Sequence, residues 1–144
     1  MNLFGVLGVS GSALLAERQR AEVAASNLAN AETTRTAEGG PYRRQHVLFA
    51  ARRPQEFART LASFADFSAR GVRVEAVVAD TAPPVLRYDP PHPDADAQGY
   101  VAYPAVNPIE EFANLMGAAR SYQLNLAAVQ ATKFMIQQSL AILR

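Results

Sequence analysis

The chain has 144 residues, a formal net charge of +1 at pH 7, no cysteine, and 49% hydrophobic residues. This length suits one domain, or a small domain with long helical extensions, and it excludes a large enzyme with separate cofactor and substrate domains. The low net charge gives no field that would favour nucleic acid or an anionic membrane as a partner. The lack of cysteine excludes disulfides, thiolate metal sites and cysteine nucleophiles.

The first ten residues are apolar but lack the basic segment of a secretory signal, and Glu17, Arg18 and Arg20 soon interrupt the apolar run. We therefore expect no cleaved signal peptide. No uninterrupted apolar run reaches the roughly 18 residues that a membrane-spanning helix needs. The sequence thus predicts no membrane span.

A first helix is predicted from about residue 3 to residue 28. Positions spaced alternately three and four residues apart form a narrow stripe of the coiled-coil kind, which comprises Phe4, Leu7, Gly11, Leu14, Arg18, Ala21, Ala25 and Leu28. The small residues in this stripe reduce apolar burial, but they let a facing helix approach closely. The large ones, Phe4, Leu7, Leu14 and Leu28, are predicted to lie in subunit interfaces.

A second, longer helix is predicted from Pro108 to the C-terminus. Asn107 suits the N-cap, Pro108 the first helical position, and Glu110 the position three residues after the cap. The same heptad spacing then gives Phe112, Leu115, Ala119, Tyr122, Leu126, Val129, Lys133, Ile136, Leu140 and Leu143, whose large apolar and aromatic members we assign to subunit interfaces. Further apolar residues outside both stripes can pack additional neighbours, and they include Leu15, Val23, Leu124, Phe134, Met135 and Ile142. We expect the two helices to pair with each other and with neighbouring copies.

Between the helices the apolar period changes to two, which predicts strands. The predicted strands cover residues 45–49, 71–80, 85–88 and 100–103. Residues 89–96 contain too much proline for a regular element, and residues 53–69 are interpreted as a short helix or a mobile loop. The predicted fold class is therefore α+β, with long terminal helices and a small β-rich middle.

Four residues that close the first helix, Asn27, Ala29, Asn30 and Thr33, resemble the Asn-x-Ala-Asn-x-x-Thr signature of the axial proteins of the bacterial flagellum, its rod and hook subunits. Other segments are similar to the proximal-rod members of this family, and they comprise residues 34–44, 88–96, 99–104, 106–107 and 121–125. The resemblance runs through nearly the whole chain. One departure is Ala105, where the family usually has asparagine.

The resemblance implies an inner domain in which residues 1–32 and 107–144 form a coiled coil, and a β-rich outer domain with extended loops at residues 33–106. It implies a structural subunit of the proximal rod that assembles helically with itself and with other rod proteins and transmits torque across the periplasm. The implied partners also include the membrane-ring or hook-basal-body adaptor protein at the rod base. Export through the flagellar type III apparatus, without cleavage, is implied as well.

Each polar cluster also has a simpler interpretation. Asn27 and Asn30 suit a helix-terminating turn, since asparagine tolerates left-handed conformations and caps backbone groups. A second cluster carries ligand atoms for a divalent metal, but its spacing matches no standard metal loop, so we interpret it as an ordered surface loop with candidate contacts to a neighbour at Asp89, His92, Asp94 and Asp96. Two basic pairs suit either solvation or salt bridges between subunits, and they are Arg43-Arg44 and Arg52-Arg53.

The serines lie in no Gly-x-Ser-x-Gly motif, and the chain has no glycine-rich phosphate loop. We therefore expect neither an enzyme nor a bound cofactor, and the sparse aromatic residues among the basic pairs argue against nucleic-acid binding. The alternative function is a cytosolic export-associated adaptor or chaperone that uses the same helices to bind other secreted flagellar subunits. Fractionation separates the two hypotheses, since a rod subunit accompanies purified basal bodies and an adaptor does not.

Overall fold

The computed structural model describes residues 3–52 and 71–142, which form two long helices and two small antiparallel hairpins. In chain order the elements are α1 (Leu3–Ala29), β1 (Gln45–Ala51), β2 (Val72–Ala79), β3 (Val85–Tyr88), β4 (Tyr100–Tyr103) and α3 (Pro108–Ile142). The α+β class predicted from the sequence is confirmed. The interpretation of residues 53–69 as a helix or loop, and the interface role of Leu143, lie outside the described residues.

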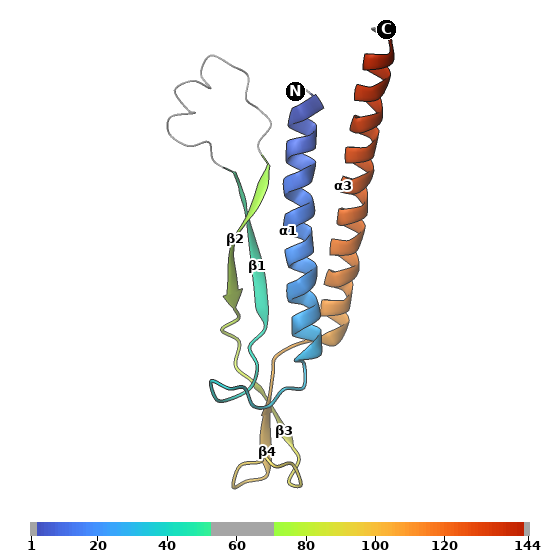
Figure 1. Ribbon diagram of the computed structural model, residues 1–144. Coiled ribbons are helices and arrows are strands. Elements are labelled where there is room, and N and C mark those ends of the chain that lie inside the picture. Colours follow the sequence, from blue (N-terminus) through green and yellow to red (C-terminus); the bar gives the residue numbers. More distant parts are fainter. Residues whose placement is uncertain (1–2, 53–70, 143–144) are drawn as a thin grey trace, which may run out of the picture.

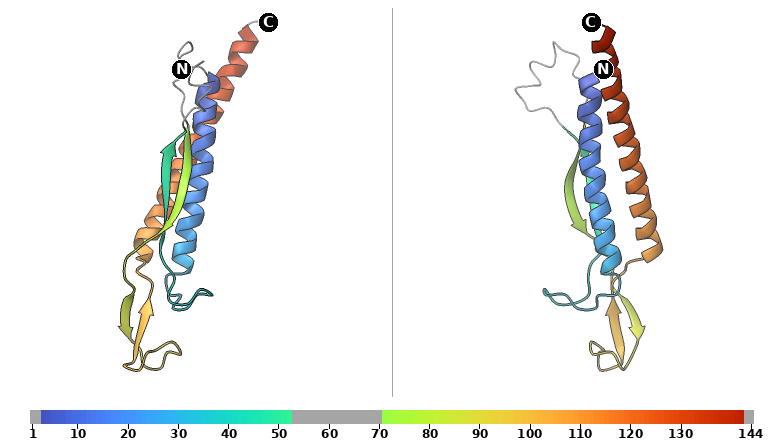
Figure 2. Two further views of the ribbon diagram at one scale, coloured as in Figure 1. Left: turned by 90° about the vertical axis from the view of Figure 1, so that its left-hand side faces the viewer. Right: turned by 45° about the vertical axis from the view of Figure 1, so that its right-hand side comes forward.

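The helices α1 and α3 lie side by side and run in opposite directions, as Figure 1 shows. The β1–β2 hairpin lies along α1, and the β3–β4 hairpin extends beyond the end of the helix pair that is remote from both termini (Figure 2). Among the described elements, α3 packs against α1 and against no other. The molecule is therefore elongated, with α1 between the first hairpin and α3.

Local capping chemistry explains where the second helix begins. The Asn107 side-chain oxygen accepts a hydrogen bond from the Ile109 backbone N–H at 3.1 Å, which satisfies one of the free donors of the first turn. Pro108 occupies the first helical position, where its missing N–H costs nothing. The predicted start is thus confirmed to the residue.

The β1 and β2 strands pair from Gln45 opposite Ala79 to Ala51 opposite Val72, with an irregularity between Leu48 and Phe49. The β1 strand is two residues longer than the sequence predicted, because Ala50 and Ala51 still pair across to β2 although alanine is a weak strand former. The β2 strand is one residue shorter at each end than the predicted 71–80.

The β3–β4 hairpin pairs Val85 with Tyr103 and Tyr88 with Tyr100, within the bounds that the sequence predicted. The rings of Tyr88 and Tyr100 meet edge to face, with centroids 5.4 Å apart. Gly99 precedes β4 with a φ of +83°, a backbone conformation that favours glycine. A Cβ at this position would also lie 3.0 Å from the Tyr88 ring.

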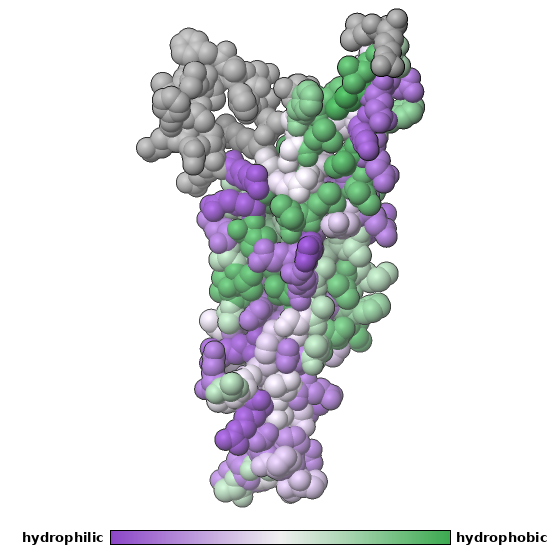
Figure 3. Space-filling view, viewed as in Figure 1, coloured by the Kyte–Doolittle hydropathy of each residue, from purple (hydrophilic) through white to green (hydrophobic). Residues whose placement is uncertain are grey.

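Small and polar side chains fill the interior of the described part of the chain. The buried apolar residues are Ala16, Ala24, Val101 and Ala118, and the buried polar ones are Ser10, Ser12, Asn27, Glu111 and Thr132. Large apolar residues instead lie on the surface, and on the face seen in Figure 3 they gather over the helices and the first hairpin, while the β3–β4 end is mostly hydrophilic. This distribution is the reverse of an ordinary soluble domain.

The first hairpin is attached to α1 near Ser12. The Ser12 hydroxyl donates to the Val9 carbonyl oxygen at 2.7 Å and accepts the Val72 backbone N–H at 3.0 Å. Gly71 lies so close that a Cβ there would be 2.3 Å from the Ser12 Oγ. The absence of a side chain at Gly71 therefore lets the strand approach the helix.

Candidate functional site

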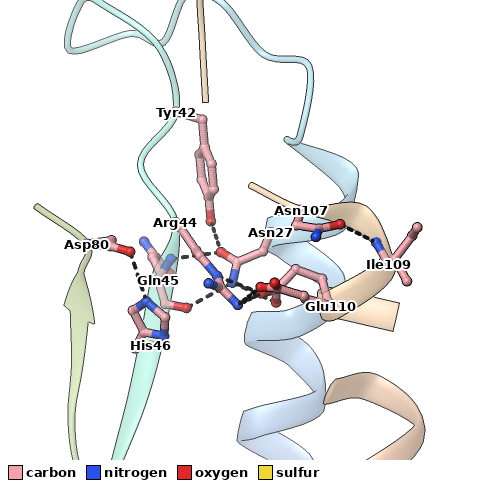
Figure 4. A network of polar contacts seen from close by, with 10 residues as sticks. Asn27, Tyr42, Arg44, Gln45, His46, Asp80, Asn107, Ile109 and Glu110 are labelled. Atoms are coloured by element: carbon pink, nitrogen blue, oxygen red, sulfur yellow. Dashed lines mark hydrogen bonds and ion pairs between the residues drawn. The ribbon is translucent and has the colours of Figure 1, made fainter. Parts of the chain in front are cut away.

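A buried polar junction connects α1, β1 and α3 at the end of the helix pair that adjoins the second hairpin (Figure 4). At its centre Asn27, only 1% exposed, uses both ends of its amide. The Asn27 Oδ1 accepts from the Gln45 backbone N–H and from the Tyr42 hydroxyl, each at 2.9 Å. The Asn27 Nδ2 donates to the Gln45 carbonyl oxygen at 2.8 Å and to the Glu111 carboxylate at 3.0 Å. All four hydrogen-bonding positions of this amide are thus used.

The carboxylate of Glu111 is buried with it, since the residue is 2% exposed. Arg44 neutralises this charge, because its Nε donates to the Glu111 Oε1 at 2.7 Å and its guanidinium forms an ion pair with the same carboxylate. The Arg44 guanidinium also lies 3.6 Å from the Glu110 carboxylate. A buried charge is tolerated only when paired and hydrogen-bonded in this way.

The remaining signature residues shape the turn after α1. The Asn30 amide donates to the Ser26 carbonyl oxygen at 2.9 Å, and the Thr33 hydroxyl donates to the Asn30 Oδ1 at 3.2 Å. The Tyr42 backbone N–H then bonds to the Thr33 carbonyl oxygen at 3.0 Å, which brings the chain back beside the helix end. The helix-terminating role expected for the asparagines agrees with this geometry, whereas the contacts of Asn27 extend much further along the chain.

A second polar contact lies at the outer side of the junction, where the His46 Nε2 is 3.3 Å from the Asp80 carboxylate (Figure 4). The backbone N–H of Ala82 donates to the Asp80 Oδ1 at 3.0 Å. This backbone hydrogen bond, followed by the contact with His46, holds the pKa of Asp80 below its ordinary value. The contact joins the start of β1 to the end of β2.

The described residues that the sequence assigned to subunit interfaces are exposed or half-buried in the single chain. The exposed ones are Phe4, Phe112, Tyr122, Leu126 and Leu140, and the half-buried ones are Leu7, Leu14, Leu28, Leu115, Val129 and Ile136. Ile109 and Met116 are exposed apolar residues that the heptad spacing missed. Residues 121–132, between Arg120 and Lys133, contain no charged residue, which is typical of a helix that other elements surround.

The predicted surface loop folds back on its own chain. The Asp94 carboxylate accepts the Thr34 hydroxyl at 2.8 Å, and the His92 Nδ1 accepts the Asp94 backbone N–H at 3.1 Å. The Asp96 carboxylate accepts the backbone N–H groups of Gln98 and Tyr100. Within residues 3–52 and 71–142, no three acidic or histidine side chains gather in a way that could hold a metal ion.

No helix in the described part of the chain is apolar enough over a sufficient length to cross a membrane. The helices are instead apolar in scattered positions, with polar residues such as Gln123, Gln130 and Gln137 between them.

Two protein-family models match the N-terminal and the C-terminal helical segments of the chain. The family model "Flagella basal body rod protein" matches residues 7–35, and the model "Flagellar basal body rod FlgEFG protein C-terminal" matches residues 97–142. The first match contains the signature around Asn27, and the second contains Glu111. The two polar partners of the junction thus lie in segments typical of flagellar rod proteins.

Curated relatives match over the whole length. Flagellar basal-body rod protein FlgC of Borreliella burgdorferi is 39% identical over 100% of this chain and 99% of its own. The FlgC proteins of Bacillus subtilis and of Escherichia coli O6:H1 are 41% and 39% identical, over 99% of this chain and 99% and 98% of theirs. The chain belongs to the FlgC family of flagellar basal-body rod proteins. It is a structural protein of the basal body and not an enzyme, and the alternative role as an adaptor has no support from these relatives.

Proposed function

We propose that this chain is a subunit of the proximal rod that assembles helically with its own copies and with other rod proteins, and that the assembly transmits torque across the periplasm. The observation that carries the proposal is the outward position of the large apolar residues of α3. Contacts between copies that repeat without closing produce a helical tube, and a tube of packed helices suits the transmission of torque.

The outer surface of α3 is defined here by Phe112, Met116, Leu124, Phe134 and Met135, all exposed. Burial of one such side chain contributes about 1.5 to 3 kcal/mol, so this surface offers on the order of 10 kcal/mol of assembly energy before entropy is subtracted. A helix that is apolar on several sides is normally surrounded by other elements. Since α3 touches only α1 among the described elements, neighbouring subunits supply the remaining contacts in our proposal.

The proposed domain division follows from the same arrangement. Residues 1–32 and 107–144 would form the inner domain, in which α1 and α3 make a coiled coil with each other and with neighbours. Residues 33–106 would form the outer β-containing domain. The polar surface of the β3–β4 end supports an outer position for this part (Figure 3), although the first hairpin lies along α1 and so bridges the two domains.

The proposed partners are further copies, other rod proteins, the membrane-ring or hook-basal-body adaptor protein at the rod base, and the type III export apparatus during export. Arg43 is exposed and suits a salt bridge to a neighbour, whereas Arg44 is already paired with Glu111. The loop between β3 and β4, which contains Asp89 and Asp96, is a proposed contact as well, because the end of the molecule formed by this hairpin is mostly hydrophilic (Figure 3).

The test uses Phe134, which is 60% exposed and can therefore be changed without disturbing the packing of a single chain. Cells that carry Phe134→Asp in place of the native chain are expected to lose motility, and their purified basal bodies should lack the protein, because a buried unpaired carboxylate costs several kcal/mol. The matched control Phe134→Leu keeps an apolar side chain and should assemble. Normal incorporation of the aspartate variant would contradict the proposed role of this surface.

A further inference from the structure

The buried centre of the contact between α1 and α3 consists of small side chains, which do little to fix the position of one helix along the other. Beyond Glu111 in the first turn, the fully buried residues of α3 are Ala118 and Thr132, and its larger side chains are half-buried or exposed. Because α3 packs only on α1 among the described elements, Ala118 and Thr132 face that helix. Small side chains form low ridges and shallow grooves. A displacement by one heptad, seven residues or about 10.5 Å, would bring Asn125 and Ser139 to the positions of Ala118 and Thr132, so that smaller or polar side chains would still face α1.

Hydrogen bonds that stay within α3 cannot fix its position along α1 either. The Asn125 amide donates to the Ser121 carbonyl oxygen at 2.9 Å, and the Thr132 hydroxyl donates to the Ala128 carbonyl oxygen at 2.8 Å. Both hydrogen bonds stay within α3, so they would survive any displacement along α1. They satisfy polar groups of α3 without fixing the position of this helix along α1.

The hydrogen bond between Asn27 and Glu111 differs because it joins the two helices across 84 positions of sequence. Both residues are almost completely buried, so breaking this 3.0 Å contact would leave an amide and a carboxylate without water to replace it. Arg44, which directly precedes β1, and the backbone of Gln45, its first residue, complete the same junction. Only one displacement of α3 satisfies all of these directional contacts together.

We propose that Asn27, Arg44 and Glu111 act as a register lock: positioning residues that fix the displacement of α3 along α1 and attach the first hairpin to the pair in the same position. The small residues of the interface supply close packing, and the register lock selects one arrangement among several that this packing tolerates. Buried polar groups select the register of packed helices in this way in other systems. The role belongs to the single chain and does not depend on the proposed assembly.

The absence of cysteine allows the displacement to be measured directly. Gln19 in α1 and Gln137 in α3 are exposed, and Gln19→Cys with Gln137→Cys would carry a pair of spin labels on the full chain, diluted with unlabelled chain to remove signals between copies. Pulsed electron paramagnetic resonance should give one narrow distance distribution. In Asn27→Ala the distribution should broaden and gain a population shifted by about 10 Å, one heptad, while far-ultraviolet circular dichroism stays unchanged.

The control Asn30→Ala removes a neighbouring amide whose contacts stay within the turn after α1, and it should keep the narrow distribution. Glu111→Gln provides a milder change that retains an acceptor for Asn27, and it should broaden the distribution less than Asn27→Ala. An unchanged distribution in Asn27→Ala with full helix content overturns the register lock. Loss of helix content in both Asn27→Ala and Glu111→Gln also overturns the register lock. The junction would then hold the fold together rather than select the register of the two helices.

Discussion

Replacing Gly71 with alanine tests how closely the first hairpin is attached to α1. An added Cβ would lie 2.3 Å from the Ser12 Oγ and 2.9 Å from the Ser12 Cβ. The hydroxyl cannot turn away freely, since it holds the Val9 carbonyl oxygen at 2.7 Å and the Val72 backbone N–H at 3.0 Å. The strand must therefore move away from the helix.

The expected cost follows from these two effects. Overpacking costs about 1 to 3 kcal/mol, and loss of the hydrogen bond to Val72 costs about 1 kcal/mol. Movement of the strand relieves part of the overlap, so we expect a net loss of about 2 kcal/mol in the attachment of this end of the hairpin. That loss corresponds to a decrease of about 30-fold in the protection of the Val72 amide against hydrogen exchange, since 1.4 kcal/mol is a factor of ten.

Hydrogen exchange followed by NMR measures the Val72 amide in Gly71→Ala and in the parent chain. The matched control is Gly117→Ala in α3, where an added Cβ meets nothing within 4 Å. That control should leave the Val72 amide unchanged and stabilise the helix by up to about 1 kcal/mol. Equal protection of Val72 in the parent and in Gly71→Ala would refute the close approach of strand and helix.

Two further changes address the ends of the elements. Asn107→Ala removes the N-cap of α3 and should lower the free energy of unfolding by about 1 kcal/mol in urea titrations; an unchanged midpoint would show that the cap contributes nothing. Because the pKa of Asp80 is lowered in the folded chain, its stabilisation is present at neutral pH and is lost as the pH falls through that lowered pKa. Asp80→Asn should therefore reduce the decline of the thermal midpoint in acid, and identical pH profiles would contradict the contacts made by its carboxylate.

Elements and their boundaries followed well from local sequence. Asn107 and Pro108 mark the start of α3 through interactions confined to one helical turn. The alternation of apolar and polar residues within residues 72–79 predicts a strand even when its pairing partner is not known. The irregularity between Leu48 and Phe49 was not predicted, because it arises from the pairing with β2 rather than from either strand alone.

The direction in which the helices face could not be derived from periodicity. The heptad spacing selected Phe112 and Leu126, which are exposed, whereas the residues that α3 buries against α1 include Ala118 and Thr132. A periodic count finds where apolar residues gather but does not distinguish contact within the chain from contact with another copy. In this chain the fully buried residues of the two helices are small or polar, and the large apolar ones are half-buried or exposed.

The junction was only partly accessible to sequence analysis. The signature drew attention to Asn27, yet Glu111 follows Glu110 in the first turn of a helix, where acidic residues are expected for their favourable interaction with the helix dipole. Nothing local distinguishes Glu111 as the buried partner of an asparagine 84 positions earlier. Such a non-local contact becomes evident only when the fold brings α1, β1 and α3 together.

The two groups of residues consequently have separable tasks. The register lock consists of polar contacts buried within one chain, and the outer surface of α3 consists of exposed apolar side chains. Asn27→Ala should therefore alter the shape of the subunit and leave its apolar surface intact. Phe134→Asp should change the apolar surface and leave the shape of the subunit intact. In the proposed helical assembly every copy would repeat the same error in subunit shape, so a displacement between α1 and α3 is expected to prevent incorporation even when every interface residue is present.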